Sequence, residues 1–167
     1  MTEICAPDTA SNIFLYGARR ALLLLHTGGS IVLIGAATHH ALQMRHYLRG
    51  RFKRSDLEKT YAKVVAVAYF TTFALGAVLY PTYRVHVRGC YLDRYAPFFA
   101  GLFDVKEVFA SLALLVAAGL GALAYTLRPA EERWFVPVYA AMSFIVCAVV
   151  WLNVVAGILI VSVRGVG

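Results

Sequence analysis

Four long runs without a charged residue constrain this sequence most strongly. They cover 21–44, 64–83, 108–127 and 134–163, and they are 24, 20, 20 and 30 residues long. A helix needs about 20 apolar residues to cross the roughly 30 Å hydrocarbon core of a bilayer. With 60% hydrophobic and 15% charged residues, the chain has too little polar sequence for a soluble globular domain, a disordered chain or a disulfide-stapled secreted module. We therefore expect a single domain, 1–167, folded as an all-α integral membrane four-helix bundle with up-down topology.

The basic residues predict an orientation. Short loops rich in Lys and Arg stay in the cytoplasm, so the segment 45–63 is expected inside and both termini outside, on the periplasmic side of a bacterial inner membrane. Over all segments the inside would carry nine basic residues and the outside seven, so the orientation depends on 45–63 alone. We interpret the net charge of +7 as this topology signal and as contact with lipid headgroups, with no nucleic-acid partner. Seven of the sixteen Lys and Arg residues fall in 45–63: Arg45, Arg49, Arg51, Lys53, Arg54, Lys59 and Lys63.

Histidine inside the first run is the most informative chemical feature. His26 and His40 are 14 residues apart, which at about 100° per residue leaves them on one helix face and about 21 Å apart along the axis. Neutral imidazole is a good axial ligand for haem iron. This spacing resembles the helices of membrane cytochromes b, in which two histidines on one helix bind two stacked b haems near opposite membrane faces.

That resemblance implies b-type haem. Each haem would need a second ligand besides His26 or His40, and the other three runs contain no histidine. His86, after the second run, is the candidate partner for His26, although counting residues leaves their depths about 13 Å apart. Met142, in the fourth run, is the candidate for His40, since histidine with methionine is an accepted haem pair. Arg84 and Arg88 would then pair with haem propionates. A neighbouring subunit could also supply the missing ligands.

Two other interpretations of His26 and His40 remain open. The histidines could form a quinone or proton site. They could also be structural residues, turned into the bundle and hydrogen-bonded to Asn153, Tyr139 or a backbone carbonyl, because a polar side chain is costly to face to lipid.

A second polar cluster is expected at the outer surface, where the second helix ends and the third begins. The pairing of Arg84 or Arg88 with Asp104 or Glu107 would be structural. Alternatively, aromatic rings beside hydrogen-bonding groups could hold a quinone headgroup or dock an extrinsic redox protein. The cluster contains Tyr80, Tyr83, Arg84, His86, Arg88, Asp104, Lys106 and Glu107.

Local patterns predict where the helices begin and end. Gly50 suits a helix end, and Ser55 with Glu58 has capping-box spacing. We expect 84–103, with its glycines and aromatic residues, to be an interfacial loop that ends at an Asp104 cap, and the fourth helix to begin near Pro129.

Small residues and cysteines complete the predicted organisation. Ala113, Ala117 and Gly121 form a stripe for close helix packing. Cys5 and Cys90 would both lie outside and could pair, whereas Cys147 lies in mid-membrane.

These features favour one functional class. We expect a subunit of a larger respiratory or redox complex that transfers electrons through b-type haem, quinone or both, together with other membrane subunits. The alternatives are a cofactor-free assembly subunit and, third, a small membrane enzyme that acts on a lipid-soluble substrate at the outer cluster. No nucleophile elbow, phosphate loop or zinc motif is present. No charged residue falls within a predicted span, which argues against a proton pump or ion-coupled transporter.

Overall fold

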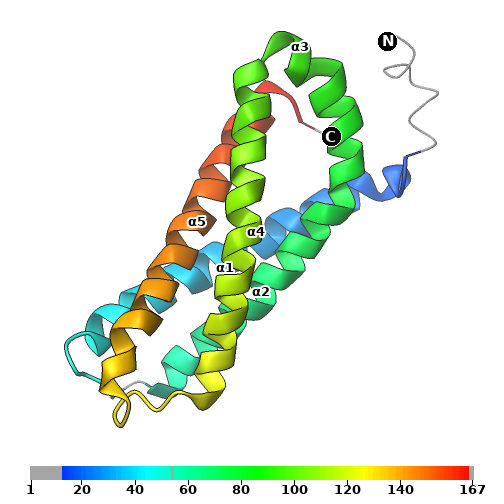
Figure 1. Cartoon of the computed structure of the whole chain (residues 1–167). Coiled ribbons are helices and arrows are strands. Elements are labelled where there is room, and N and C mark those ends of the chain that lie inside the picture. The colour runs from blue at the N-terminus through cyan, green and yellow to red at the C-terminus, as the bar shows by residue number, and fades with distance from the viewer. Residues whose placement is uncertain (1–12, 54, 166–167) are drawn as a thin grey trace.

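The computed structural model describes residues 13–53 and 55–165, and within these residues the chain is helical with no strand. Four helices are long and apolar enough to cross a membrane, as the charge-free runs predict. The helices are shown in Figure 1. They are η3 (Tyr16–Ala18), α1 (Arg19–Tyr47), α2 (Ser55–Thr82), the π-helix η4 (Tyr83–Leu92), α3 (Asp93–Tyr95), α4 (Pro97–Thr126), η5 (Arg133–Phe135) and α5 (Val136–Val163).

The long helices pack in a ring. α1 packs against α2, α2 against α4, α4 against α5, and α5 returns to α1. In Figure 1 the α1–α2 and α4–α5 connections lie at one end of the bundle, and α3 and the C-terminus lie at the other. We call these the loop end and the α3 end.

The first helix boundaries agree with the sequence patterns. α1 ends at Tyr47, and Gly50 follows with φ +70°, a left-handed conformation that glycine adopts without strain. The Gly50 N–H donates to the Tyr47 carbonyl over 2.9 Å, which satisfies one of the free carbonyls at the helix end. α2 then begins at Ser55, as predicted.

The predicted loop at 84–103 is wrong, because that segment is helical. The helical segment that begins at Ser55 continues through η4 and α3 to Tyr95, over 41 residues. It breaks only at Ala96 (φ −150°, ψ 57°), and Pro97 then begins α4, because proline suits the first turn of a helix. Asp104 is therefore inside α4 instead of at its N-cap. The fourth helix also begins later than predicted, at Val136.

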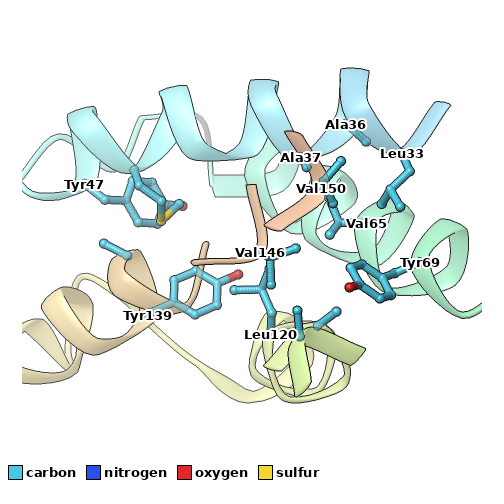
Figure 2. Packing of buried hydrophobic residues seen from close by; sticks show 14 of the residues in the cluster. Leu33, Ala36, Ala37, Tyr47, Val65, Tyr69, Leu120, Tyr139, Val146 and Val150 are labelled. Carbon is cyan, nitrogen blue, oxygen red and sulfur yellow. The ribbon is translucent and has the colours of Figure 1, made fainter. Parts of the chain in front are cut away.

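The stripe of small residues on α4 makes the predicted close contact. Ala113 and Ala117 are buried, and a Cβ added to Gly121 would lie 2.6 Å from the Ala66 Cβ on α2. Two helices can approach this closely only where side chains are small. Larger side chains fill the rest of the core, as Figure 2 shows for Leu120, Tyr139 and Val146.

The core is not evenly distributed along α1. All seven buried residues of α1 lie from Leu33 to Tyr47, and the first half of the helix has none. α1 is therefore held mainly by its half nearer the loop end, where the polar side chains described below lie.

Alanine substitutions at two glycines test the α2–α4 contact. We expect Gly121→Ala to lower the free energy of unfolding by about 1–3 kcal/mol, because overpacking forces the helices apart. Gly157→Ala on α5 is the matched control, since a Cβ there meets no atom within 4 Å. Both would be measured by thermal unfolding in detergent, followed by circular dichroism. Equal melting temperatures for the two variants would disprove the close contact.

Candidate functional site

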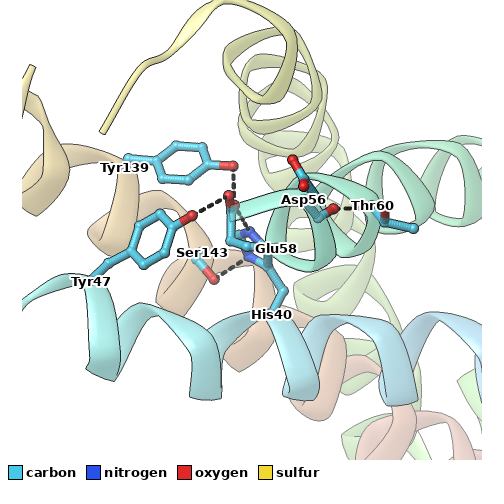
Figure 3. A network of polar contacts seen from close by, with 7 residues as sticks. All are labelled: His40, Tyr47, Asp56, Glu58, Thr60, Tyr139 and Ser143. Atoms are coloured by element: carbon cyan, nitrogen blue, oxygen red, sulfur yellow. Dashed lines mark hydrogen bonds and ion pairs between the residues drawn. The ribbon is translucent and has the colours of Figure 1, made fainter. Parts of the chain in front are cut away.

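A buried carboxylate lies in the core near the loop end. Glu58, in the first turn of α2, is 1% exposed, and His40 on α1 is also 1% exposed. Figure 3 shows these two side chains facing each other between α1, α2 and α5. We call the five hydrogen-bonded residues here the polar cluster: His40, Tyr47, Glu58, Tyr139 and Ser143.

Three donors converge on the Glu58 carboxylate. His40 Nε2 lies 2.8 Å from Oε1, and the Tyr139 hydroxyl donates to the same oxygen over 2.6 Å. The Tyr47 hydroxyl donates to Oε2 over 3.1 Å. A carboxylate taken out of water is tolerated only when such bonds replace its hydration.

His40 extends the chain of hydrogen bonds to α5. Its Nδ1 lies 2.7 Å from the Ser143 hydroxyl oxygen. A serine hydroxyl can donate to a neutral imidazole or accept from a protonated one. The cluster can therefore gain or lose one proton while all four hydrogen bonds stay in place.

The pattern of α2 explains why Glu58 turns inward. The buried residues of this helix recur at helical spacing, and Glu58 begins the stripe that faces the core: Glu58, Ala62, Val65, Tyr69 and Thr72. The predicted capping role for the Glu58 carboxylate is wrong, because its oxygens accept side-chain hydrogen bonds from α1 and α5. Glu58 belongs to the segment predicted as the first loop, outside the predicted span 64–83. The structure nevertheless buries its carboxylate in the core of the bundle, so the absence of charged residues from the predicted spans does not argue against proton handling.

His26 lies further along α1 against α2. Its Nδ1 is 3.0 Å from the Thr72 carbonyl oxygen, so Nδ1 donates and, in the neutral ring, Nε2 carries a lone pair. Gly76 leaves room for the ring, since a Cβ there would lie 3.2 Å from His26 Cε1. A backbone carbonyl anchoring one ring nitrogen is common among histidines that bind metal through the other nitrogen. The same hydrogen bond to the Thr72 carbonyl would also satisfy the ring of a histidine with a purely structural role.

The structure does not bring together the predicted haem ligands. Both ring nitrogens of His40 are engaged, with Glu58 and Ser143, so His40 does not fit as an axial ligand in this arrangement. Met142 is turned toward α4, where its methyl carbon lies 3.0 Å from the position of a Cβ on Gly119. These two side chains therefore have different neighbours.

His86 is also separated from His26. Its ring lies 5.0 Å from that of Tyr16, and Tyr16 precedes His26 by ten residues, which is about 15 Å along a helix. The His86 Nε2 atom is buried and has no hydrogen-bond partner among the described residues. Across 13–53 and 55–165 no group of three or more His, Cys, Asp or Glu side chains could hold a metal ion. Haem ligation by His26 or His86 stays a prediction that needs ligands from elsewhere.

The second predicted cluster forms at the α3 end. Arg88 donates to both carboxylate oxygens of Asp104, over 2.5 and 3.0 Å, and its Nε lies 3.4 Å from Asp93. This confirms the expected ion pair between η4 and α4. Arg84 is exposed and makes no ion pair or hydrogen bond with the described part of the chain.

The cysteines differ in state. Cys90 is disulfide-bonded, whereas Cys147 on α5 is a free thiol. Cys5, the predicted partner of Cys90, lies outside the described residues.

Comparisons with protein-family models, with curated proteins and with solved structures find no match for this chain. Its function has therefore to be inferred from its own residues.

Two adjacent histidines provide a matched test of the polar cluster. We expect His40→Ala to destabilise the bundle by on the order of 3 kcal/mol, because it leaves the Glu58 carboxylate buried without its partner. His39→Ala is the control, since His39 is exposed, its ring nitrogen bonds the Gly35 carbonyl of its own helix, and it meets α2 only through a ring stack with Tyr61. Thermal unfolding of both variants in detergent measures the difference. Similar losses would mean that the pair does not hold the helices together.

A second test removes a single hydroxyl. Tyr139→Phe deletes the 2.6 Å hydrogen bond to Glu58 and keeps the ring in place. We expect it to lower the free energy of unfolding by about 1–3 kcal/mol, whereas Tyr125→Phe, at a position 71% exposed, should change it little. Chemical unfolding monitored by tryptophan fluorescence gives both values. A neutral Tyr139→Phe would show that the carboxylate does not depend on this donor.

Proposed function

We propose that this chain is a four-span, up-down integral membrane subunit of a larger respiratory or redox complex. Within it, the polar cluster would exchange the proton that accompanies electron transfer to or from a quinone. The observation that supports this most is the fully buried pair of Glu58 and His40 in a bundle of membrane-length helices. An ionisable side chain at such a position usually has a functional role, because burying it is expensive.

The chemistry of the cluster suits proton exchange. His40 is the group that changes protonation, since Ser143 can reverse the direction of its hydrogen bond. Glu58 and the two phenols keep their bonds in both states. Little reorganisation is then needed when the proton moves, which is what a proton relay requires.

Haem and quinone are the electron carriers of this proposal. A b-type haem would be held by His26 through Nε2, with the Thr72 carbonyl fixing the ring, and its other ligand would come from a partner subunit. Haem or quinone supplies the one-electron chemistry. The residues of this chain bind, orient and exchange protons, so the chain is a subunit and not a stand-alone enzyme.

The orientation is part of the proposal. The loop end carries the basic segment 45–63 and would face the cytoplasm of a bacterium, with the α3 end and both termini in the periplasm. The disulfide at Cys90 agrees with this, because disulfides persist in oxidising compartments. Other membrane subunits, and an extrinsic redox protein at the α3 end, are the proposed partners.

A cofactor-free assembly subunit is the second candidate. His26 and His40 already have protein partners, as structural histidines do. Gly28 and Gly35 on α1 have open space around them, which would let a neighbouring helix approach closely.

The two candidates are separated by purifying the tagged chain from native membranes with its partners retained. We expect haem or quinone in the preparation, measured by reduced-minus-oxidised spectra, a haemochrome assay and quinone extraction. We also expect His26→Ala to remove the haem band. A colourless, quinone-free preparation with its partners present would disprove the redox proposal and favour the assembly subunit.

The proton role has its own test in the same preparation. Glu58→Gln should lower the proton uptake on reduction, followed with a pH-indicator dye, by about one proton per complex, because a neutral amide no longer stabilises a protonated His40, and it should leave the cofactor content unchanged. Glu107→Gln, which changes a carboxylate on α4, is the control and should leave uptake unchanged. Normal uptake in Glu58→Gln would contradict the role assigned to the cluster.

A further inference from the structure

A pocket opens at the α3 end, far from the polar cluster. It has a volume of about 450 Å³, within the range of roughly 300–1,000 Å³ that is typical of small-molecule sites. Arg84 follows Glu58 by 26 residues, or about 39 Å along a continuous helix, so the two sites are independent. The pocket is lined by Tyr80, Arg84, Arg88, Gly89 and Asp93.

The two arginines of this pocket differ in charge compensation. Arg88 is held by Asp104 and Asp93, which neutralise its charge and fix its side chain. Arg84 is exposed, and no acidic group among the described residues pairs with it. The lining therefore presents one guanidinium with unused donors beside a second that is already fixed in place.

The backbone around the pocket is unusual. Four of its five lining residues belong to η4 or its continuation into α3, and η4 is a π-helix of ten residues. π-Helical turns are rare and occur often at functional sites. A Cβ at Gly89 would lie 3.3 Å from the Arg84 carbonyl oxygen of the same helix, a tight contact that glycine avoids. Two of the three buried, unpartnered side-chain polar atoms in the described residues, Tyr83 Oη and His86 Nε2, also belong to η4.

We infer that this pocket binds a phosphate-bearing anion through the Arg84 guanidinium, with the phosphate of an anionic glycerophospholipid headgroup as the expected source. Arginine matches phosphate oxygens with a planar fork of donors. The pocket lies near the end of a membrane-length helix, where headgroups are found, and the Tyr80 ring provides an apolar wall suited to that interface. Asp93, which is half exposed, can accept a hydrogen bond from a glycerol hydroxyl.

The test uses the full-length protein, delipidated in detergent. Soluble short-chain phosphatidylglycerol, short-chain phosphatidylcholine, inorganic phosphate and a short-chain quinone are titrated separately, with binding read by native mass spectrometry and by thermal shift. We expect phosphatidylglycerol to bind, and Arg84→Ala to weaken that binding by roughly tenfold or more. Arg84→Lys keeps the charge but loses the planar fork of donors, so its affinity for phosphatidylglycerol should lie between those of the wild type and Arg84→Ala. Arg20→Ala, at an exposed arginine on the first turn of α1, should bind like the wild type.

The ligands separate the sources of the phosphate. Arg84-dependent binding of phosphatidylglycerol alone supports the lipid headgroup, and equal binding of inorganic phosphate supports the anion site with a free phosphate as its ligand. Binding that Arg84→Ala leaves unchanged overturns the proposal. Equal binding of phosphatidylcholine, or Arg84-dependent binding of the quinone alone, overturns it as well. Unliganded melting temperatures show that each variant is folded, which is expected because Arg84 is exposed.

Discussion

The hydrogen bonds that converge on the Glu58 carboxylate are the interaction on which the arrangement of the helices depends. The donors come from α1 and α5, the two helices that close the ring, whereas the acceptor is on α2. Because a buried carboxylate without its donors is far more costly than an apolar side chain, sliding α1, α2 or α5 would incur a large penalty. Apolar packing is less directional, so the polar cluster defines which side chains must face each other.

The two ends of the bundle are built differently. At the loop end, His40 and Glu58 are buried, and their side chains are hydrogen-bonded to each other and to Tyr47, Tyr139 and Ser143. At the α3 end, Arg88, Asp93 and Asp104 form an ion-pair network with partly exposed side chains, beside Arg84, which pairs with no acidic group among the described residues. A buried pair suits exchange of a small ion such as a proton, whereas an open pocket with such an arginine suits a larger anion. The apolar middle keeps the two sites separate.

Sequence patterns predicted the number of membrane-length helices, because the mean hydropathy of a span is taken over about 20 residues and changes little when one residue is misjudged. They missed Glu58, because Lys59 and Lys63 separate it from the charge-free run 64–83. The helical spacing of Glu58 with Ala62, Val65 and Tyr69 was nevertheless readable. The segment 84–103 was mistaken for a loop because Gly89 and the aromatic residues suggested a break, although Pro97 indicated the true start of α4. The neighbours of His26 and His40 could not be deduced, since a shared helix face does not say which helix covers each residue.

The uneven burial of α1 has a consequence for how this chain can change over evolution. At the seven buried positions of α1, all from Leu33 onward, a new side chain must fit the packed core, so substitutions there require compensation elsewhere. Before Leu33, only local contacts such as those of His26 and Gly29 with Thr72 impose a similar demand. The first half of α1 thus places fewer packing demands on its sequence than the second, so it can adapt to a new lipid environment or a new neighbour without a change to the core.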